Sequence, residues 1–175
     1  MSWVSENQLN VLVPVDVPEG PTTLVVTRAG ISSTPVPVQI QRIAPALFQF
    51  DAGNRKYVAA NHVNGTPVGD PGLYPGVTTP ARPGEVVTLW GTGFGRTDPG
   101  IPAGQIVTAA SRLVAVPVIS VAGATADVQF AGLTIAGVYQ FNVRIPDGIP
   151  DGDAPVVVQV EGTTTQANAN ITVKH

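Results

Sequence analysis

The sequence contains no cysteine, which excludes disulfide bonds and thiolate metal sites along its 175 residues. Charge is also scarce, since Asp, Glu, Lys and Arg together make up 12% of the chain. The nine Lys and Arg residues are scattered, and only Arg55 and Lys56 are adjacent. This pattern argues against nucleic acid as a partner, because binding needs a concentrated basic patch. The sequence also lacks a basic amphipathic stretch of the kind that would predict attachment to a membrane surface.

Long apolar runs are missing as well. No run approaches the roughly 20 residues that a membrane-spanning helix needs, so no membrane span is predicted. The first residues lack the basic region and apolar core of a signal peptide. No window shows a sustained helical period, and 19 Gly and 17 Pro residues disfavour long helices. A hydrophobic content of 43% nevertheless predicts a folded chain rather than a disordered one.

The sequence does have clear β periodicity. In one run Val36, Val38 and Ile40 alternate with Pro37 and Gln39. Similar short runs are rich in Val, Ile, Thr and aromatic residues, and Gly or Pro bounds most of them: 9–13, 24–26, 86–90, 116–121, 128–130, 139–145, 156–160 and 171–173. Strands at this spacing without intervening helices predict an all-β, immunoglobulin-like antiparallel β-sandwich.

The chain also contains an internal repeat. Residues 8–33, here called the first copy, align without a gap on residues 140–165, the second copy. Both copies read as a strand, a Pro-bounded turn, a Gly, a strand and a Gly turn. Turn glycines and prolines recur where the same backbone angles are required twice. A supersecondary unit repeated at long spacing is typical of tandem domains.

The positions of the two copies predict the domain organisation. We expect residues 1–42 to be the C-terminal half of a truncated immunoglobulin-like unit and residues 84–175 to be a complete β-sandwich. Residues 43–83 then form a connector and hairpin region around Asn64-Gly65, a good hairpin turn signal. An isolated half-unit would expose apolar faces and strand edges. We therefore expect a homodimer through residues 1–42, with folding back on the rest of the chain as the alternative.

Two sequence patterns resemble known families. Residues 84–95, GEVVTLWGTGFG, resemble the first strand of IPT/TIG immunoglobulin-like domains. A longer pattern resembles an uncharacterised C-terminal domain family of large exported bacterial proteins, and it comprises residues 59–61, 64–65, 80–85, 91–95, 128–133 and 137–146. The resemblance implies tandem immunoglobulin-like units, an extracellular or cell-surface location, and contacts with domains of the parent protein or with other proteins. It implies no established catalytic residues.

Metal-ligating residues are few. Asp147, Asp151 and Asp153 lie in one turn and offer the oxygen ligands that calcium favours. The first copy, however, has a carboxylate at only one matching position, Glu19. Ordinary Asp-Gly turn chemistry explains the same residues, so we expect no cofactor, with calcium as the alternative. A transition metal would need His62 together with carboxylates, because the chain has only two histidines.

Catalytic motifs are equally sparse. There is no G-x-S-x-G nucleophile elbow for a hydrolase triad through His62, and the GTGFG segment lacks the lysine and following helix of a phosphate-binding loop. Tyr57 and Tyr74 flank loops and are the candidate residues for stacking against a sugar. We expect a non-catalytic structural or interaction module, such as a spacer, cap or adhesion-type domain. The alternatives are a carbohydrate-binding module and a small metal-dependent hydrolase.

Overall fold

The structure, a computed structural model, describes residues 3–14, 16–50, 56–102 and 105–175. Within these ranges the protein is all-β, its strands pair antiparallel, and no helix is long and apolar enough to cross a membrane. The predicted all-β, antiparallel class is thus confirmed. Met1, Ser2 and Val15, which belong to the N-terminal segment and the first copy, lie outside the described residues. The chain divides into two compact units, namely residues 1–42 with 102–104 (unit 1) and residues 43–101 with 105–175 (unit 2).

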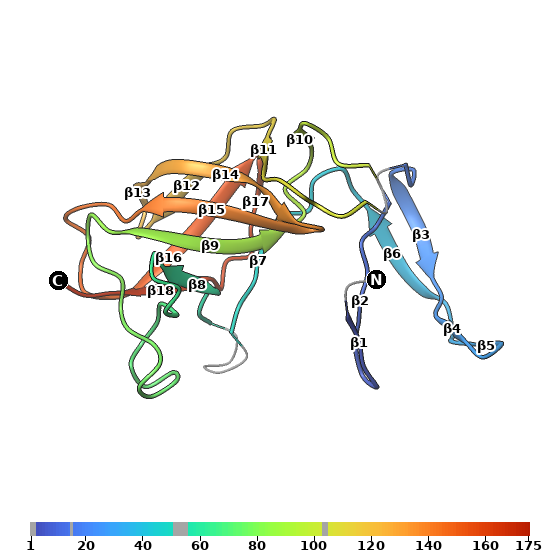
Figure 1. The fold of residues 1–175 in the computed structure, drawn as a ribbon, viewed down its shortest axis with the longest axis horizontal. Coiled ribbons are helices and arrows are strands. Elements are labelled where there is room, and N and C mark those ends of the chain that lie inside the picture. Colours follow the sequence, from blue (N-terminus) through green and yellow to red (C-terminus); the bar gives the residue numbers. More distant parts are fainter. Residues whose placement is uncertain (1–2, 15, 51–55, 103–104) are drawn as a thin grey trace. The chain divides into compact units, whose positions relative to one another are not determined.

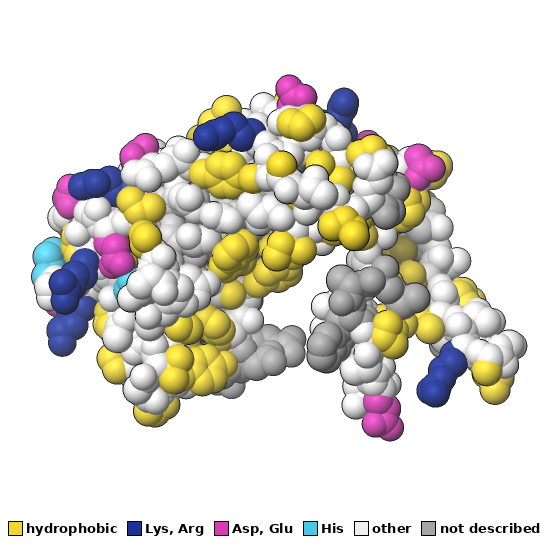
Figure 2. All heavy atoms as spheres, in the orientation of Figure 1, with side chains coloured by type: hydrophobic (Ala, Val, Ile, Leu, Met, Phe, Trp, Pro, Cys, Tyr) yellow, Lys and Arg dark blue, Asp and Glu magenta, His cyan; other side chains and the backbone are white. Residues whose placement is uncertain are grey.

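The described strands of unit 1 form three two-stranded sheets. β1 (Trp3–Val4) pairs with β2 (Leu9–Asn10), β3 (Gly20–Leu24) with β6 (Val36–Ile40), and β4 (Thr27–Arg28) with β5 (Ile31–Ser32). Gly30 adopts a φ of +79° in the tight turn between β4 and β5, a conformation open to glycine without steric cost. Hydrophobic side chains are visible on the surface of this unit in Figure 2. The exposed large ones are Val4, Leu9, Val11, Leu12, Val13, Leu24, Val25, Val26, Ile31 and Val36.

Unit 2 contains two larger sheets (Figure 1). Along the first sheet the strand order is β10 (Thr97–Asp98), β11 (Ser111–Leu113), β14 (Asp127–Ile135), β15 (Val138–Arg144), β9 (Val86–Thr92) and β7 (Ala46–Leu47), and β8 (Ala60–His62) also pairs with β9. Along the second sheet the order is β13 (Ala124–Thr125), β12 (Val118–Val121), β16 (Gly152–Val160) and β17 (Thr163–Thr164), and β18 (Asn170–Val173) also pairs with β16.

Alternating side chains of the two sheets build one hydrophobic core. On β9 the buried residues include Val87 and Leu89, and on β16 they include Val156 and Val158. Buried residues from both sheets belong to the same cluster. The period of two residues along each strand directs these side chains to one face. The result is a sandwich-like arrangement in which sheet-on-sheet packing supplies the core.

Residues 43–83 contribute strands and core to unit 2. β7 and β8 both pair with β9, and Val58, Val68 and Ala81 are buried in the shared core. Around Asn64-Gly65 the chain turns back on itself, because the Gly65 N–H donates to the His62 carbonyl and the Asn64 side chain accepts from Thr66 N–H. The region expected to form a connector and hairpin therefore also contributes paired strands and buried side chains to unit 2.

The GTGFG segment spans the end of β9 and a close-packed turn after it. Gly93 has a φ of +77°, and Gly91, two residues earlier, lies against the carbonyl of Ala46. The Gly93 carbonyl accepts a hydrogen bond from the Ala44 N–H at 2.9 Å. Phe94 is fully buried with its ring centroid 4.6 Å from that of Phe141. The glycines thus let two backbone segments approach while the phenylalanine anchors the turn in the core.

Candidate functional site

The densest polar cluster with a predicted ligand residue is centred on Asp153, which lies on β16. Lys56 Nζ lies 2.5 Å from Asp153 Oδ2, and the Tyr57 hydroxyl donates to the same oxygen at 3.1 Å. Thr172 Oγ1 on β18 donates to the other carboxylate oxygen, Oδ1, at 3.2 Å. A parallel bridge between Tyr57 and Asn170 brings the 56–57 segment beside β18. The cluster therefore joins three segments that are far apart in the sequence.

The charges in this cluster shift one another's titration. The pKa of Lys56 is raised, first by its hydrogen bond to Asp153 and then by the carboxylate charge. The pKa of Tyr57 is raised by burial and by its hydrogen bond to Asp153. Partial burial acts to raise the pKa of Asp153, but the hydrogen bonds from Lys56 and Tyr57 outweigh it and lower the pKa. At neutral pH the cluster is accordingly a closed ion pair with a neutral phenol, and no member is poised as an acid or base.

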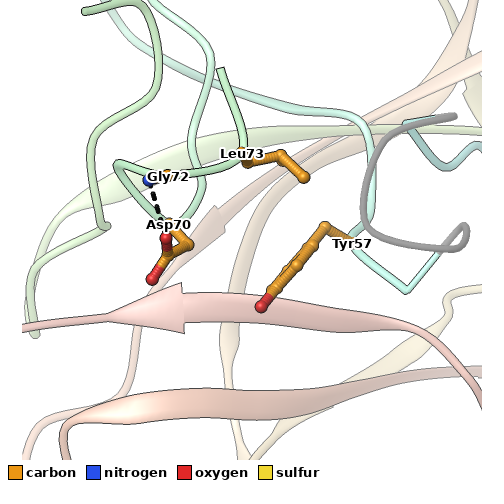
Figure 3. A pocket seen from close by; sticks show the side chains of 4 residues that line it. All are labelled: Tyr57, Asp70, Gly72 and Leu73. Atoms are coloured by element: carbon orange, nitrogen blue, oxygen red, sulfur yellow. Dashed lines mark hydrogen bonds between the residues drawn. The ribbon is translucent and has the colours of Figure 1, made fainter. Parts of the chain in front are cut away.

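Tyr57 also borders a shallow, open depression of about 240 Å³, together with Asp70, Gly72 and Leu73. Figure 3 shows the Tyr57 ring, the Leu73 side chain and the Asp70 carboxyl group around this hollow. One Asp70 oxygen accepts a hydrogen bond from the Gly72 N–H at 2.7 Å, which fixes the loop. A hollow of this size is smaller than the pockets of about 300–1,000 Å³ that hold drug-sized ligands.

The second candidate aromatic residue has a different neighbour. Tyr74 packs edge-on against Phe50, with ring centroids 5.6 Å apart. Its backbone N–H donates to the Thr78 hydroxyl, so the 70–78 loop holds it from within. Tyr74 does not line the depression beside Tyr57. The structure therefore places the two tyrosines in separate local contacts.

The three aspartates of the 146–153 turn have different surroundings. Asp151 accepts hydrogen bonds from the backbone N–H of His175 at 2.9 Å and lies 2.6 Å from its ring Nδ1. These hydrogen bonds lower the pKa of Asp151. Asp153 instead binds Lys56 as described above, and Asp147 lies near Gly84. Within the described part of the chain, no group of three or more His, Cys, Asp or Glu side chains is arranged to hold a metal ion.

His62 links two side chains that the sequence did not single out. Its Nδ1 lies 2.5 Å from Glu85 Oε1, and its Nε2 lies 2.9 Å from the Thr79 hydroxyl. The register of β8 on β9 places His62 opposite Val87, which brings Glu85 within reach. A hydroxyl, an imidazole and a carboxylate in this order could in principle activate a nucleophile. The depression beside Tyr57 and a second hollow beside Arg112, however, are both lined by other residues, so neither presents Thr79 to a substrate.

Sequence reasoning named Tyr57, Asp153 and His62 but missed their partners. Lys56 and Glu85 are ordinary charged residues in the sequence, and only the fold brings them next to their partners. In comparisons with known proteins, no family model, no curated protein and no solved structure matches the chain. Its function is therefore inferred from its own residues.

Proposed function

We propose that the chain is a non-catalytic structural or interaction module of a larger exported bacterial protein, with an IPT/TIG-like immunoglobulin fold. One observation carries the proposal: the polar candidates bind one another across strands and loops. Asp153 is held by Lys56 and Tyr57, and His62 lies between Glu85 and Thr79. Side chains engaged in this way tie segments of a sandwich together, a role suited to a spacer, cap or adhesion-type domain.

The location and the parent protein are part of the same proposal. The sequence resemblance around GTGFG supports an extracellular or cell-surface module that contacts neighbouring domains or other proteins. Fold alone does not assign function. The support therefore comes from the contacts of the candidate residues together with the sequence resemblance.

An activity assay tests the non-catalytic proposal. The purified chain is incubated with p-nitrophenyl esters, phosphates and glycosides, beside variants His62→Ala and Thr79→Val. We expect the same background rate for all three proteins, because the depression beside Tyr57 does not include Thr79 and the Thr79 hydroxyl is engaged with His62. Turnover by the unsubstituted chain that disappears in both variants would establish a hydrolase and overturn the proposal. Metal analysis of the same preparation, including calcium, tests the metal-dependent alternative.

A carbohydrate-binding module is the second candidate. It is favoured by the open depression in which the Tyr57 ring lies beside Asp70 and Leu73, because aromatic faces and carboxylates suit sugar rings. A glycan array probed with the unsubstituted chain and with Tyr57→Ala tests this alternative. Tyr74→Ala is the matched control, since Tyr74 packs against Phe50 outside the depression. Binding that Tyr57→Ala removes and Tyr74→Ala preserves would support this function. An array without a binder would refute it.

A further inference from the structure

The two repeat copies share backbone geometry as well as sequence. Gly30 in the first copy has a φ of +79°, and the matching Gly162 in the second has a φ of +80°. The residues before them, Ala29 and Glu161, have φ values of +50° and +46°, which few non-glycine residues adopt. Two neighbouring left-handed residues at matching positions identify the same tight turn in both copies.

The hydrogen bonds around this turn also match. In the first copy Ser33 N–H donates to the Val26 carbonyl at 2.9 Å, and Val26 N–H donates to the Ser33 hydroxyl at 3.1 Å. In the second copy Thr165 N–H donates to the Val158 carbonyl at 3.0 Å, and Val158 N–H donates to the Thr165 hydroxyl at 3.1 Å. Val26 and Val158 therefore occupy equivalent places in equivalent hairpins.

The second copy shows what covers such a hairpin. β15 lies between β9 and β14 in one sheet, while β12 adds antiparallel to β16 in the other. In this register Ile119 lies opposite Val158 and Val121 lies opposite Val156. Val156 and Val158 are 1% and 0% exposed and belong to the core that the two sheets share. Strands from residues 86–135 thus supply both the edge partner of β16, which is β12, and strands of the sheet whose side chains share this core.

The first copy has the equivalent apolar face, but this face is exposed to solvent. Leu24 and Val26 match Val156 and Val158 but are 49% and 41% exposed. Among the described residues, β3 pairs only with β6, so its other edge has no strand beside it. Val26 directs its backbone groups toward Ser33, and strand alternation therefore turns those of Val25 toward this edge. An apolar face and an unpaired edge meet at the same residues.

We propose that unit 1 is a docking surface for a polypeptide that supplies the strands which β9 and β12 supply to the second copy. The occupant is thus the N-terminal half of an immunoglobulin-like unit of the same type. One of its strands adds antiparallel along the end of β3 and the residues that follow it, opposite Leu24 and Val26, in the register that β12 takes on β16. Main-chain hydrogen bonds give affinity in this mode, and alternating side-chain sites give specificity.

The required chemistry of the occupant follows from the register. The residues opposite Leu24 and Val26 must be apolar, as Val121 and Ile119 are in unit 2, and the residue between them faces outward, as Ser120 does. In the other part of the half-unit, β1 already takes the place beside β2 that β14 takes beside β15, and among the described residues the other edge of β2 has no strand beside it. There Trp3 is opposite Asn10, as Phe130 is opposite Asn142 on β14 and β15. The strand equivalent to β9 adds at that edge, as β9 adds to β15, so one occupant spans both β2 and β3.

A fusion protein tests the proposal with the segment that supplies these strands to the second copy. Residues 84–139 are placed directly before Gln8 of residues 8–175, because Gln8 matches Gln140 in the repeat. We expect amide exchange of Val25 to slow by at least about 100-fold relative to the unfused full chain, since its N–H would join a sheet. Binding of a dye specific for exposed apolar surface should fall in parallel.

Matched substitutions show whether the expected face is the one covered. Val26→Asp should lower the denaturant midpoint of the fusion protein, while it leaves the unfused chain unchanged because Val26 is already half-exposed there. Ile31→Asp is the control: Ile31 lies at the β4–β5 turn, is 78% exposed, and should be neutral in both proteins. Equal effects of the two substitutions in the fusion protein would overturn the proposal.

Two further outcomes would also overturn it. Val25 could remain unprotected in the fusion protein, which would mean that the first copy cannot be completed by such strands. Alternatively, the unfused chain could sediment as a dimer at micromolar concentration and become monomeric with Val26→Asp, which would make a second copy of this chain the occupant. This inference deepens the proposed interaction role. Its failure would leave the non-catalytic proposal standing, because turnover assays test that one separately.

Discussion

Substituting Gly93 with Ala should destabilise unit 2 by considerably more than a typical surface substitution. Gly93 lies in the turn after β9, where its φ is +77°. An added Cβ would lie 2.0 Å from the carbonyl oxygen of Ala44 and 2.7 Å from its carbonyl carbon. The Ala44 segment cannot withdraw freely, because its N–H donates to the Gly93 carbonyl at 2.9 Å. The new methyl group therefore opposes both a backbone angle and a close backbone approach.

The magnitude follows from these two effects. A left-handed conformation costs a non-glycine residue about 1–2 kcal/mol, and forced overpacking costs about 1–3 kcal/mol. We expect a loss of about 3 kcal/mol from a total free energy of unfolding of about 5–15 kcal/mol. Gly123→Ala is the matched control, because Gly123 has a φ of +80° but an added Cβ there meets no atom within 4 Å. That variant should lose only about 1 kcal/mol, from the backbone angle alone.

Urea unfolding measures the difference. Trp90 fluorescence follows unit 2 when the substitutions are made in a Trp3→Phe background, and far-UV circular dichroism gives a second probe of the same transition. The thermal midpoint of Gly93→Ala should fall by roughly 10 °C. If Gly93→Ala and Gly123→Ala lose the same free energy within about 0.5 kcal/mol, the clash is absorbed without cost. The close approach would then contribute nothing to the stability of the turn.

Two further predictions concern the ion pair and the core. Partial burial is outweighed by the hydrogen bond from Lys56, so the pKa of Asp153 lies below its ordinary value of 3.8. The resulting stabilisation is complete above pH 3.8 and is lost as the pH falls through the lowered pKa. Asp153→Asn should therefore lower the thermal midpoint near neutral pH. In strong acid its thermal midpoint should approach that of the unsubstituted chain, and a difference between the two midpoints that stays constant across the pH range would contradict this linkage. In the core, Val158→Ala should cost about 2 kcal/mol, while Val26→Ala at the matching repeat position should stay within about 0.5 kcal/mol; denaturant curves of both variants decide the comparison.

The all-β class could be predicted from the sequence because its physical basis is local. Alternation along 86–90 and 156–160 indicates which side chains share a face, and the structure buries alternate residues of β9 and β16 accordingly. The glycines of GTGFG likewise indicate a turn rather than a phosphate loop, and the structure shows a turn followed by β10. Local angle requirements and side-chain period are properties that a short stretch of sequence carries by itself.

The partners of the candidate residues could not be predicted in the same way. Lys56 lies 97 residues before Asp153 in the chain and reaches it because a bridge at Tyr57 places Lys56 beside β18. His62 meets Glu85 because β8 pairs with β9 in one particular register. Such contacts depend on which strands become neighbours and on the register in which they pair. The spacing of the charged residues determines neither of these. A surface ion pair also contributes little to stability, so the sequence pattern around it is weakly constrained.

The internal repeat separates these two kinds of information within one chain. Leu24 and Val26 have the same apolar spacing as Val156 and Val158, and the hairpins around them share hydrogen bonds and backbone angles. Yet one pair is half-exposed and the other is buried. The difference arises because side chains of a second sheet pack against β16 in one shared core, whereas the described strands of unit 1 form only two-stranded sheets. Alternation thus determines which residues share a face, while packing against a second sheet determines whether that face is removed from water.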